Sequence, residues 1–334
     1  MSIVNVRRFV QIFFLALFIV IFLRTTLVGE NDTEPWATFF FDIDPLLLVS
    51  TYIASGSVLQ SMLLALIVVA LTLLLGRLFC GWVCPLGTVF NFVSWCRGGP
   101  VARLIRTGTW SQWQKSKYLL LIGLLIAALC GLHLVGIFDP LPLFYRTMAT
   151  SIYPAFDWSA KEFFTWLYHT DPGVGPVKVT NVSEPVYSFL DDHVLSFDPI
   201  ASDGGVLIGI LFILLMVLAL VRFRFWCRYI CPLGALLGLC SKTSRVELYN
   251  DPEKCVNCNL CVPYCHGACD PHLQNDWKKQ ECFVWFNCRE RCPEGAISCR
   301  WRLSRRSWQI VPPIRPRKKK SEFVAKDNGE KSKT

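Results

Sequence analysis

Several features that mark common soluble enzymes are missing from this sequence of 334 residues. It contains no paired nucleophile and base, no phosphate-binding loop and no dinucleotide-binding fingerprint. Only 18% of the residues are charged, and the chain has five histidines. We therefore expect no independent enzyme active site in this chain.

The scarcity of charge accompanies a high apolar content, since 53% of the residues are hydrophobic. The apolar residues cluster into long runs, which is typical of a membrane protein. A helix needs about 20 residues to cross a hydrocarbon core of about 30 Å. Four segments are long enough, and we expect transmembrane helices at about 9–28, 58–79, 118–138 and 205–221.

The first of these segments lacks a small-residue cleavage site, although Arg7 and Arg8 precede it as in a signal peptide. We therefore expect it to stay as a membrane anchor. Bases are absent from 30–57, where five acids lie, whereas 85–117 carries five bases and no acid. Because basic loops stay in the cytoplasm, the sequence predicts a multi-pass protein of the bacterial inner membrane with both termini cytoplasmic. The net charge of +9 suits anionic lipid headgroups, and no nucleic-acid partner is expected.

Cysteine, in contrast, is abundant, and two cysteine runs lie near the C-terminus. A cubane iron–sulfur cluster takes three thiolates from one loop with two-residue gaps and a fourth from a distant cysteine. The first run has this spacing, and the second has it if Trp285 replaces a cysteine. The runs are Cys255-x2-Cys258-x2-Cys261-x3-Cys265 and Cys282-x2-Trp285-x2-Cys288-x3-Cys292-Pro293.

These runs resemble a bacterial two-cluster ferredoxin module, in which the fourth cysteine of each run serves the other cluster. The resemblance implies a [4Fe–4S] cluster on Cys255, Cys258, Cys261 and Cys292. It implies a second cluster on Cys265, Cys282 and Cys288, with Cys269 or Cys299 as the fourth ligand because Trp285 cannot bind iron. A three-iron cluster or an open iron is the alternative for this second site. Zinc is the alternative for both sites, whereas disulfides do not suit a reducing compartment.

The apolar part of the chain contains an internal repeat of Cys-x3-Cys-Pro-Leu-Gly, preceded in each half by Asp-Pro elements. Cysteines four residues apart share a helix face, and the following proline marks a helix end or kink. If the halves are parallel repeats around an axis along the membrane normal, four thiols meet at the cytoplasmic surface and hold a further iron–sulfur cluster. The alternative is that they are unreactive buried cysteines. The residues concerned are Cys80, Cys84, Cys227 and Cys231.

His133 is the ionisable candidate in the third predicted span, near Asp139 and the outer face. A proton-accepting role in quinol oxidation fits this position, and a simple hydrogen-bonding role is the alternative. No second histidine in the spans completes an axial pair for haem. The long outer loop at 139–204 is rich in aromatic residues, which suit a membrane interface, a quinone pocket or a partner.

Residues 5–300 together resemble the membrane-bound polyferredoxins typified by the NapH-type quinol dehydrogenase subunit. The resemblance rests on the paired Cys-x3-Cys-Pro motifs, the four spans and the following ferredoxin module; Trp285, Cys269 and the long outer loop depart from it. It implies electron transfer between quinone and other subunits of a respiratory redox complex. The alternative is an accessory protein that senses redox state or handles copper, because soft thiolates suit Cu(I).

The predicted fold class is an all-α bundle of four transmembrane helices in two parallel repeats, followed by a small cytoplasmic α+β ferredoxin-like module. The predicted boundaries are 1–245 for the bundle, with repeats at about 5–100 and 115–245, 246–302 for the module and 303–334 for a basic disordered tail.

Overall fold

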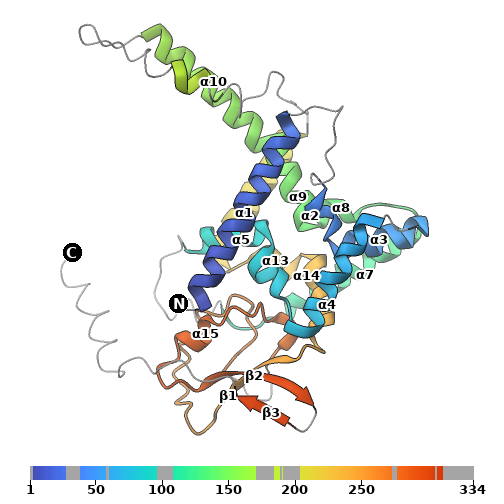
Figure 1. The fold of residues 1–334 in the computed structure, drawn as a ribbon, viewed down its shortest axis with the longest axis vertical. Helices are drawn as coiled ribbons and strands as arrows, with labels where there is room; N and C mark the ends of the chain where they lie inside the picture. Colours follow the sequence, from blue (N-terminus) through green and yellow to red (C-terminus); the bar gives the residue numbers. More distant parts are fainter. Residues whose placement is uncertain are drawn as a thin grey trace, which may run out of the picture.

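The computed structural model describes residues 3–27, 38–57, 60–95, 108–170, 184–188, 190, 204–272, 277–304 and 307–310. The described part of the chain is mostly helical, and a small sheet lies against one end of the helices, as Figure 1 shows. The first half contains α1 (Ile3–Leu27), α2 (Phe39–Asp42), α3 (Pro45–Ser55), the 3-10 turn η1 (Gln60–Leu64), α4 (Ala65–Leu75), the π-helical turn η2 (Phe79–Val83) and α5 (Pro85–Trp95).

The second half repeats this order of elements with insertions. It contains η3 (Gln112–Lys115), α7 (Ser116–Leu129), α8 (Val135–Phe138), α9 (Pro140–Thr147), η4 (Met148–Ile152), α10 (Tyr153–Thr170), α12 (Gly205–Val221), α13 (Phe225–Tyr229) and α14 (Pro232–Ser241). Helix α10, from the aromatic outer loop, extends away from the other helices in Figure 1. Several of its aromatic side chains are exposed, among them Trp158 and Trp166.

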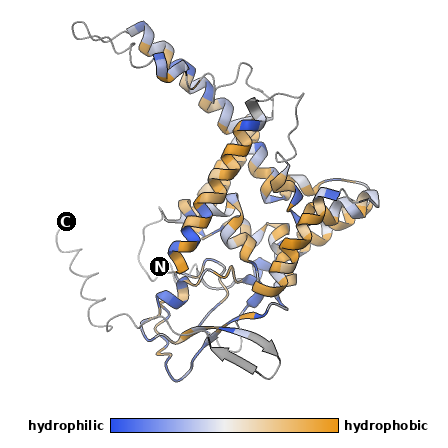
Figure 2. Ribbon diagram, viewed as in Figure 1, coloured by the Kyte–Doolittle hydropathy of each residue, from blue (hydrophilic) through white to orange (hydrophobic). Residues whose placement is uncertain are grey.

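One helix in the described ranges is long and apolar enough to cross a membrane, over Ile3–Thr25 of α1. Shorter apolar helices occupy Pro45–Ser55, Gln60–Leu75, Gly205–Val221 and Pro232–Ser241. Figure 2 shows apolar residues along α1 and along the group formed by α3, α4 and α7.

The prediction of one helix across 118–138 is wrong, because α7 ends at Leu129. Gly131 follows with φ 79°, a conformation that glycine adopts without a steric penalty, and Leu132 N–H bonds the carbonyl of Ala127 at 2.9 Å. This glycine turn satisfies the end of the helix and stops it.

Both cysteine–proline pairs break the helices as predicted. Cys84 has extended backbone, with ψ 118°, and Cys231 is likewise outside the helical region, with ψ 110°. Pro85 and Pro232 then begin α5 and α14, since proline needs no hydrogen-bonded N–H at the start of a helix.

The two halves interlock through the helices that follow these prolines. Helix α5 of the first half packs against α12 of the second, and α14 of the second packs against α4 of the first. One large buried cluster joins both halves, and we call it the helical core; it includes Phe79, Leu86, Phe90, Trp226, Leu233 and Leu237. The crossed packing therefore brings the two copies of the motif into a common interior.

The Asp-Pro elements of the two halves also meet. Asp44 and Asp139 immediately precede α3 and α9, and neither has any exposed surface. Their carboxyl groups are close enough to hydrogen-bond to each other when one is protonated. The third Asp-Pro pair, at 198–199, lies outside the described residues.

The C-terminal part is built on a three-stranded antiparallel sheet of order β1-β2-β3. Strand β1 (Val246–Asn250) precedes the first cysteine run, and β2 (Ile297–Ser304) and β3 (Ser307–Ile310) follow the second. The short elements η5 (Lys279–Glu281) and α15 (Asn287–Glu290) flank the second run. Strand pairing thus continues past the module boundary predicted at 302, and 311–334 lies outside the described residues.

Candidate metal centres

The first cysteine run folds around a hollow of about 370 Å³ that includes open solvent. Asn257 and Asn259 allow the tight loop because both have positive φ, 50° and 55°, a conformation that asparagine tolerates. Burial and the neighbouring thiols raise the pKa of Cys261 to about 12. We call this space the first hollow, and the thiols around it are Cys255, Cys258, Cys261 and Cys292.

The second hollow, of about 310 Å³, is lined by Cys265, Cys269, Cys282 and Cys288. The Sγ atoms of Cys265 and Cys269 are 3.2 Å apart, and the bond donated by Cys269 lowers the pKa of Cys265. Cys299 lies on β2 and does not line this hollow, and burial raises its pKa to about 11. The geometry therefore favours Cys269 over Cys299 as the fourth thiol.

The two hollows are joined through side chains packed between them. Cys261 of the first hollow and Cys288 of the second share one small buried cluster with Val262 and Ile297. Nowhere in the described ranges do three histidine, cysteine or acidic side chains gather closely enough to hold a single metal ion.

The four thiols of the repeated motif lie together in the helical core, and we call them the four-thiol site. Cys80, Cys84, Cys227 and Cys231 are between 3% and 8% exposed. Burial, followed by the charges of Cys227 and Cys80, raises the pKa of both Cys84 and Cys231. Metal binding requires thiolates, so an iron core at this site would favour the ionised form of these cysteines.

Each half sends an arginine across to the other half at this site. Arg224 donates to the carbonyl oxygens of Cys80, at 2.9 Å, and Gly87, at 2.7 Å. Arg77 of the first half lies at the equivalent place beside the second half: its Nη2 is 2.8 Å from the position that a Cβ on Gly234 would occupy. A side chain larger than hydrogen at Gly234 would therefore displace this guanidinium.

These arginines place two positive charges in the interior, and one carboxylate, that of Glu281, lies 3.5 Å from Arg77. Both side chains have no exposed surface. Within the described residues, three of their nitrogen atoms lack a hydrogen-bond partner: Nε and Nη2 of Arg77 and Nε of Arg224. Buried cations cost several kcal/mol unless anions compensate them. A cluster held by four thiolates is negatively charged overall, so the donor set and its surroundings fit such a group.

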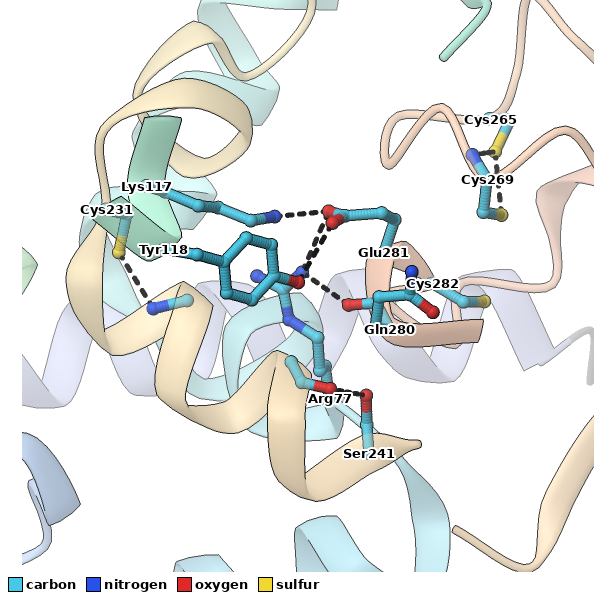
Figure 3. Close-up of polar contacts among 12 residues, drawn as sticks. Arg77, Lys117, Tyr118, Cys231, Ser241, Cys265, Cys269, Gln280, Glu281 and Cys282 are labelled. Carbon is cyan, nitrogen blue, oxygen red and sulfur yellow. Dashed lines mark hydrogen bonds and ion pairs between the residues drawn. The ribbon is translucent and has the colours of Figure 1, made fainter. Parts of the chain in front are cut away.

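The anion that the structure does supply comes from the C-terminal part. Glu281 of η5 points toward Lys117, Tyr118 and Arg77 of the helices, as Figure 3 shows. Lys117 donates a short hydrogen bond to this carboxylate, Tyr118 donates at 3.1 Å, and Arg77 lies 3.5 Å away. Arg77 also donates to the carbonyl of Gln280 at 3.0 Å. This ion-pair network fixes the second cysteine run against the four-thiol site.

His133 lies outside the helix that was expected to carry it at membrane depth. It lies in the turn between α7 and α8 and is exposed, because α7 ends before reaching it. Its role in proton transfer stays a prediction, whereas Asp44 and Asp139 are carboxyl groups that the fold buries.

Sequence reasoning missed the two arginines although a signal was present. Arg77 and Arg224 each stand three residues before the first cysteine of their motif, so the repeat is Arg-x2-Cys-x3-Cys-Pro-Leu-Gly in both halves. Glu281 gave no comparable signal, since one glutamate beside Cys282 resembles any exposed acid.

A family model described as a 4Fe-4S binding domain matches residues 59–103 and 205–247, which contain the two copies of the motif. Ferredoxin-type protein NapH of Escherichia coli is 26% identical over 272 residues, covering 77% of this chain and 75% of NapH. Methylamine utilization ferredoxin-type protein MauN of Methylobacillus flagellatus is 21% identical over 323 residues, covering 92% of this chain and 93% of MauN.

The putative electron transport protein YccM of Escherichia coli is 23% identical over 235 residues, which cover 70% of this chain and 53% of YccM. No solved structure matches the chain. The repeated motif, the matching domain model and these relatives agree with one another: the chain is similar to ferredoxin-type proteins such as NapH and MauN and matches a 4Fe-4S binding domain twice.

Proposed function

We propose that this protein is a membrane-bound iron–sulfur subunit that relays electrons between the quinone pool and a redox partner. The observation that carries the proposal is the order of the thiol groups. The four-thiol site contacts the second cysteine run, and the second hollow adjoins the first through Cys261 and Cys288. Three neighbouring thiolate sites in a row, leading from apolar helices to a more exposed module, are what a relay requires.

Each of the three thiol groups would hold one cluster. Bound iron–sulfur clusters accept and release one electron each without moving a substrate atom. The first hollow would hold a [4Fe–4S] cluster on Cys255, Cys258, Cys261 and Cys292; the second hollow on Cys265, Cys269, Cys282 and Cys288; and the four-thiol site on Cys80, Cys84, Cys227 and Cys231. The N–H of Gly234 donates to Cys231 Sγ at 3.2 Å, a contact of the kind that adjusts cluster potentials.

The proposed placement is multi-pass in the inner membrane, with both termini cytoplasmic. Contacts at the start of α1 support it, because Arg7 donates to the carbonyl of Trp285 at 2.9 Å and to Asn287 at 2.8 Å. The start of α1 and the cysteine-rich module therefore lie on the same side of the helices (Figure 1). The bases of 85–117 favour the cytoplasm for that side.

Copper handling fits this geometry less well than electron transfer does. A protein that exchanges Cu(I) with a partner needs thiols that the partner can reach, as ligand exchange proceeds by direct contact. The four thiols of the repeated motif are 8% exposed or less. Such burial suits a resident group whose electrons move while its ligands stay in place.

The proposal is tested by replacing one thiol in each half. Cys80→Ser and Cys227→Ser should each lose the same electron paramagnetic resonance signal and about four iron atoms per chain, because they would hold one cluster. Reduction of the remaining clusters by menadiol should stop, while dithionite should still reduce them. Cys130→Ser, at an exposed cysteine, is the matched control and should resemble the wild type. Unequal phenotypes for the two variants, or unchanged iron, would contradict the shared site.

A further inference from the structure

Trp285 occupies the place in the second run where a ligand cysteine is expected, and its side chain packs into the helical core. Trp285 and Phe283 belong to the helical core, whereas Cys282 and Cys288 pack within the module. The 282–288 loop thus begins and ends at the second hollow while its middle is inserted among the helices.

The indole of Trp285 is held on several sides by the helices. Its Nε1–H donates to the carbonyl of Gly81 at 3.1 Å. The guanidinium groups of Arg7 and Arg224 lie 4.3 Å and 4.4 Å from the ring centre, within the range of a cation–π contact. Trp82 anchors the same loop by donating to the carbonyl of Val284 at 3.1 Å.

The loop lies in close contact with the helices at Gly81. A Cβ on Gly81 would overlap the carbonyl oxygen of Phe283 and stand 2.9 Å from Nε1 of Trp285. The residues on either side, Val284 and Phe286, have φ 54° and 59°, and non-glycine residues in this region cost about 1–3 kcal/mol each. The surrounding contacts must therefore hold the loop in this conformation.

Trp285 lies between two of the thiol groups. On the helical side, Gly81 directly follows Cys80, and Arg224 contacts both the indole and the carbonyl of Cys80. On the module side, Trp285 lines the second hollow, and the ring of His266, next to Cys265, is 4.3 Å from the indole. A continuous packed path of backbone, hydrogen bond and rings joins the two sites.

We propose that Trp285 is the contact through which electrons pass between the four-thiol site and the second hollow. This inference rests on the proposed function, since it requires a cluster at each site. If both sites hold clusters, one electron would pass from a reduced cluster at the four-thiol site to an oxidised cluster at the second hollow. No bond forms or breaks, no proton moves, and the indole acts as a packed bridge that is itself neither oxidised nor reduced.

The test measures electron transfer between the clusters in the full-length protein in detergent. Flash photoreduction with deazaflavin injects electrons without quinol, and rapid-freeze paramagnetic resonance follows the two cluster signals. Trp285→Leu should slow the transfer by about tenfold or more, equivalent to about 1.4 kcal/mol in the barrier, with both signals and the iron content retained. Trp285→Phe should slow it less, because the ring stays and only the bond to Gly81 is lost.

Trp277→Leu is the control, because Trp277 packs against Cys265, Cys269 and Cys282 but does not belong to the helical core. It should transfer electrons at the wild-type rate. Unchanged transfer in Trp285→Leu with both clusters present would overturn the inference.

A second variant approaches the same contact from the helical side. Gly81→Ala should push the loop away, slow the transfer about as much as Trp285→Leu and raise hydrogen exchange of the 282–288 amides. Gly123→Ala is its control, because a Cβ there meets nothing within 4 Å. If Trp285→Leu loses the second cluster, a wild-type rate in Gly81→Ala overturns the inference. Loss of that cluster in both variants would also overturn it, since Trp285 would then be only a structural support.

Failure of the proposed function gives a different result. In that case menadiol would reduce no cluster in any protein, the wild type included, or Cys80→Ser would keep every signal. The deazaflavin comparison between wild type and Trp285→Leu does not depend on menadiol.

Discussion

The four-thiol site and the first hollow use the same ligand chemistry in opposite surroundings. The four-thiol site takes two cysteines from each half of the chain and is buried among apolar side chains and arginines. The first hollow takes three cysteines from one short loop, and Cys255, Cys258 and Cys292 are only partly buried. Where ligands are adjacent in sequence, a local loop is enough to gather them; where they are far apart, the whole fold must do it.

The surroundings differ in charge as well as in exposure. Fully buried Arg77 and Arg224 stand beside the four-thiol site, whereas asparagine turns and solvent surround the first hollow. Buried cations stabilise added negative charge more strongly than water and exposed dipoles do, since screening is weak in the interior. We therefore expect the negative charge added on reduction to be compensated mainly by protein charge at the four-thiol site and mainly by solvent at the first hollow.

The largest expected effect comes from removing the carboxylate that joins the two regions. Glu281→Gln leaves Lys117 and Arg77 buried without their anion, which costs about 3–5 kcal/mol for a pair broken on one side. The module should separate from the helices, and the thermal unfolding midpoint of the solubilised protein should fall. Glu253→Gln, at an exposed position, is the control and should leave the midpoint unchanged. An unchanged midpoint in Glu281→Gln would show that docking does not depend on this charge.

A smaller and more local effect is expected from a ligand of the first hollow. Cys258→Ser should remove about one cluster's iron, about four atoms per chain, and loosen the cysteine-rich module, because ligation energy in such modules is also folding energy. The signal assigned to the four-thiol site should persist. Iron analysis measures the lost iron, and paramagnetic resonance measures whether the signal of the four-thiol site persists. Loss of all signals together would mean that the two regions do not fold independently.

The smallest expected effect distinguishes the two candidate fourth ligands of the second hollow. Cys269→Ser should convert or destabilise the cluster there, because its Sγ is 3.2 Å from that of Cys265. Cys299→Ser should alter only the packing of the strands and lower the free energy of unfolding by about 1 kcal/mol, since Cys299 lies outside the hollow. The measured quantity is the line shape of the second cluster's signal. A change in Cys299→Ser alone would reverse the assignment.

The sequence by itself determined the local features of this protein. The spacing of the first run predicts a loop that gathers Cys255, Cys258 and Cys261, and these residues line the first hollow. Pro85 and Pro232 predict the breaks at Cys84 and Cys231, because proline restricts the residue before it. Apolar runs predict the helices but not their ends, and Gly131 stops α7 before His133.

Contacts between distant segments were decided only by the tertiary structure. Arg224 reaches Cys80, Glu281 reaches Lys117, and Trp285 reaches Gly81 because α5 and α14 cross onto the helices of the opposite halves. No local pattern encodes these partners, since each depends on how complete helices pack. Likewise, the choice between Cys269 and Cys299 depends on where β2 places Cys299 relative to the hollow. Backbone preferences act over a few residues, whereas burial and charge pairing act between whatever segments the packed fold brings together.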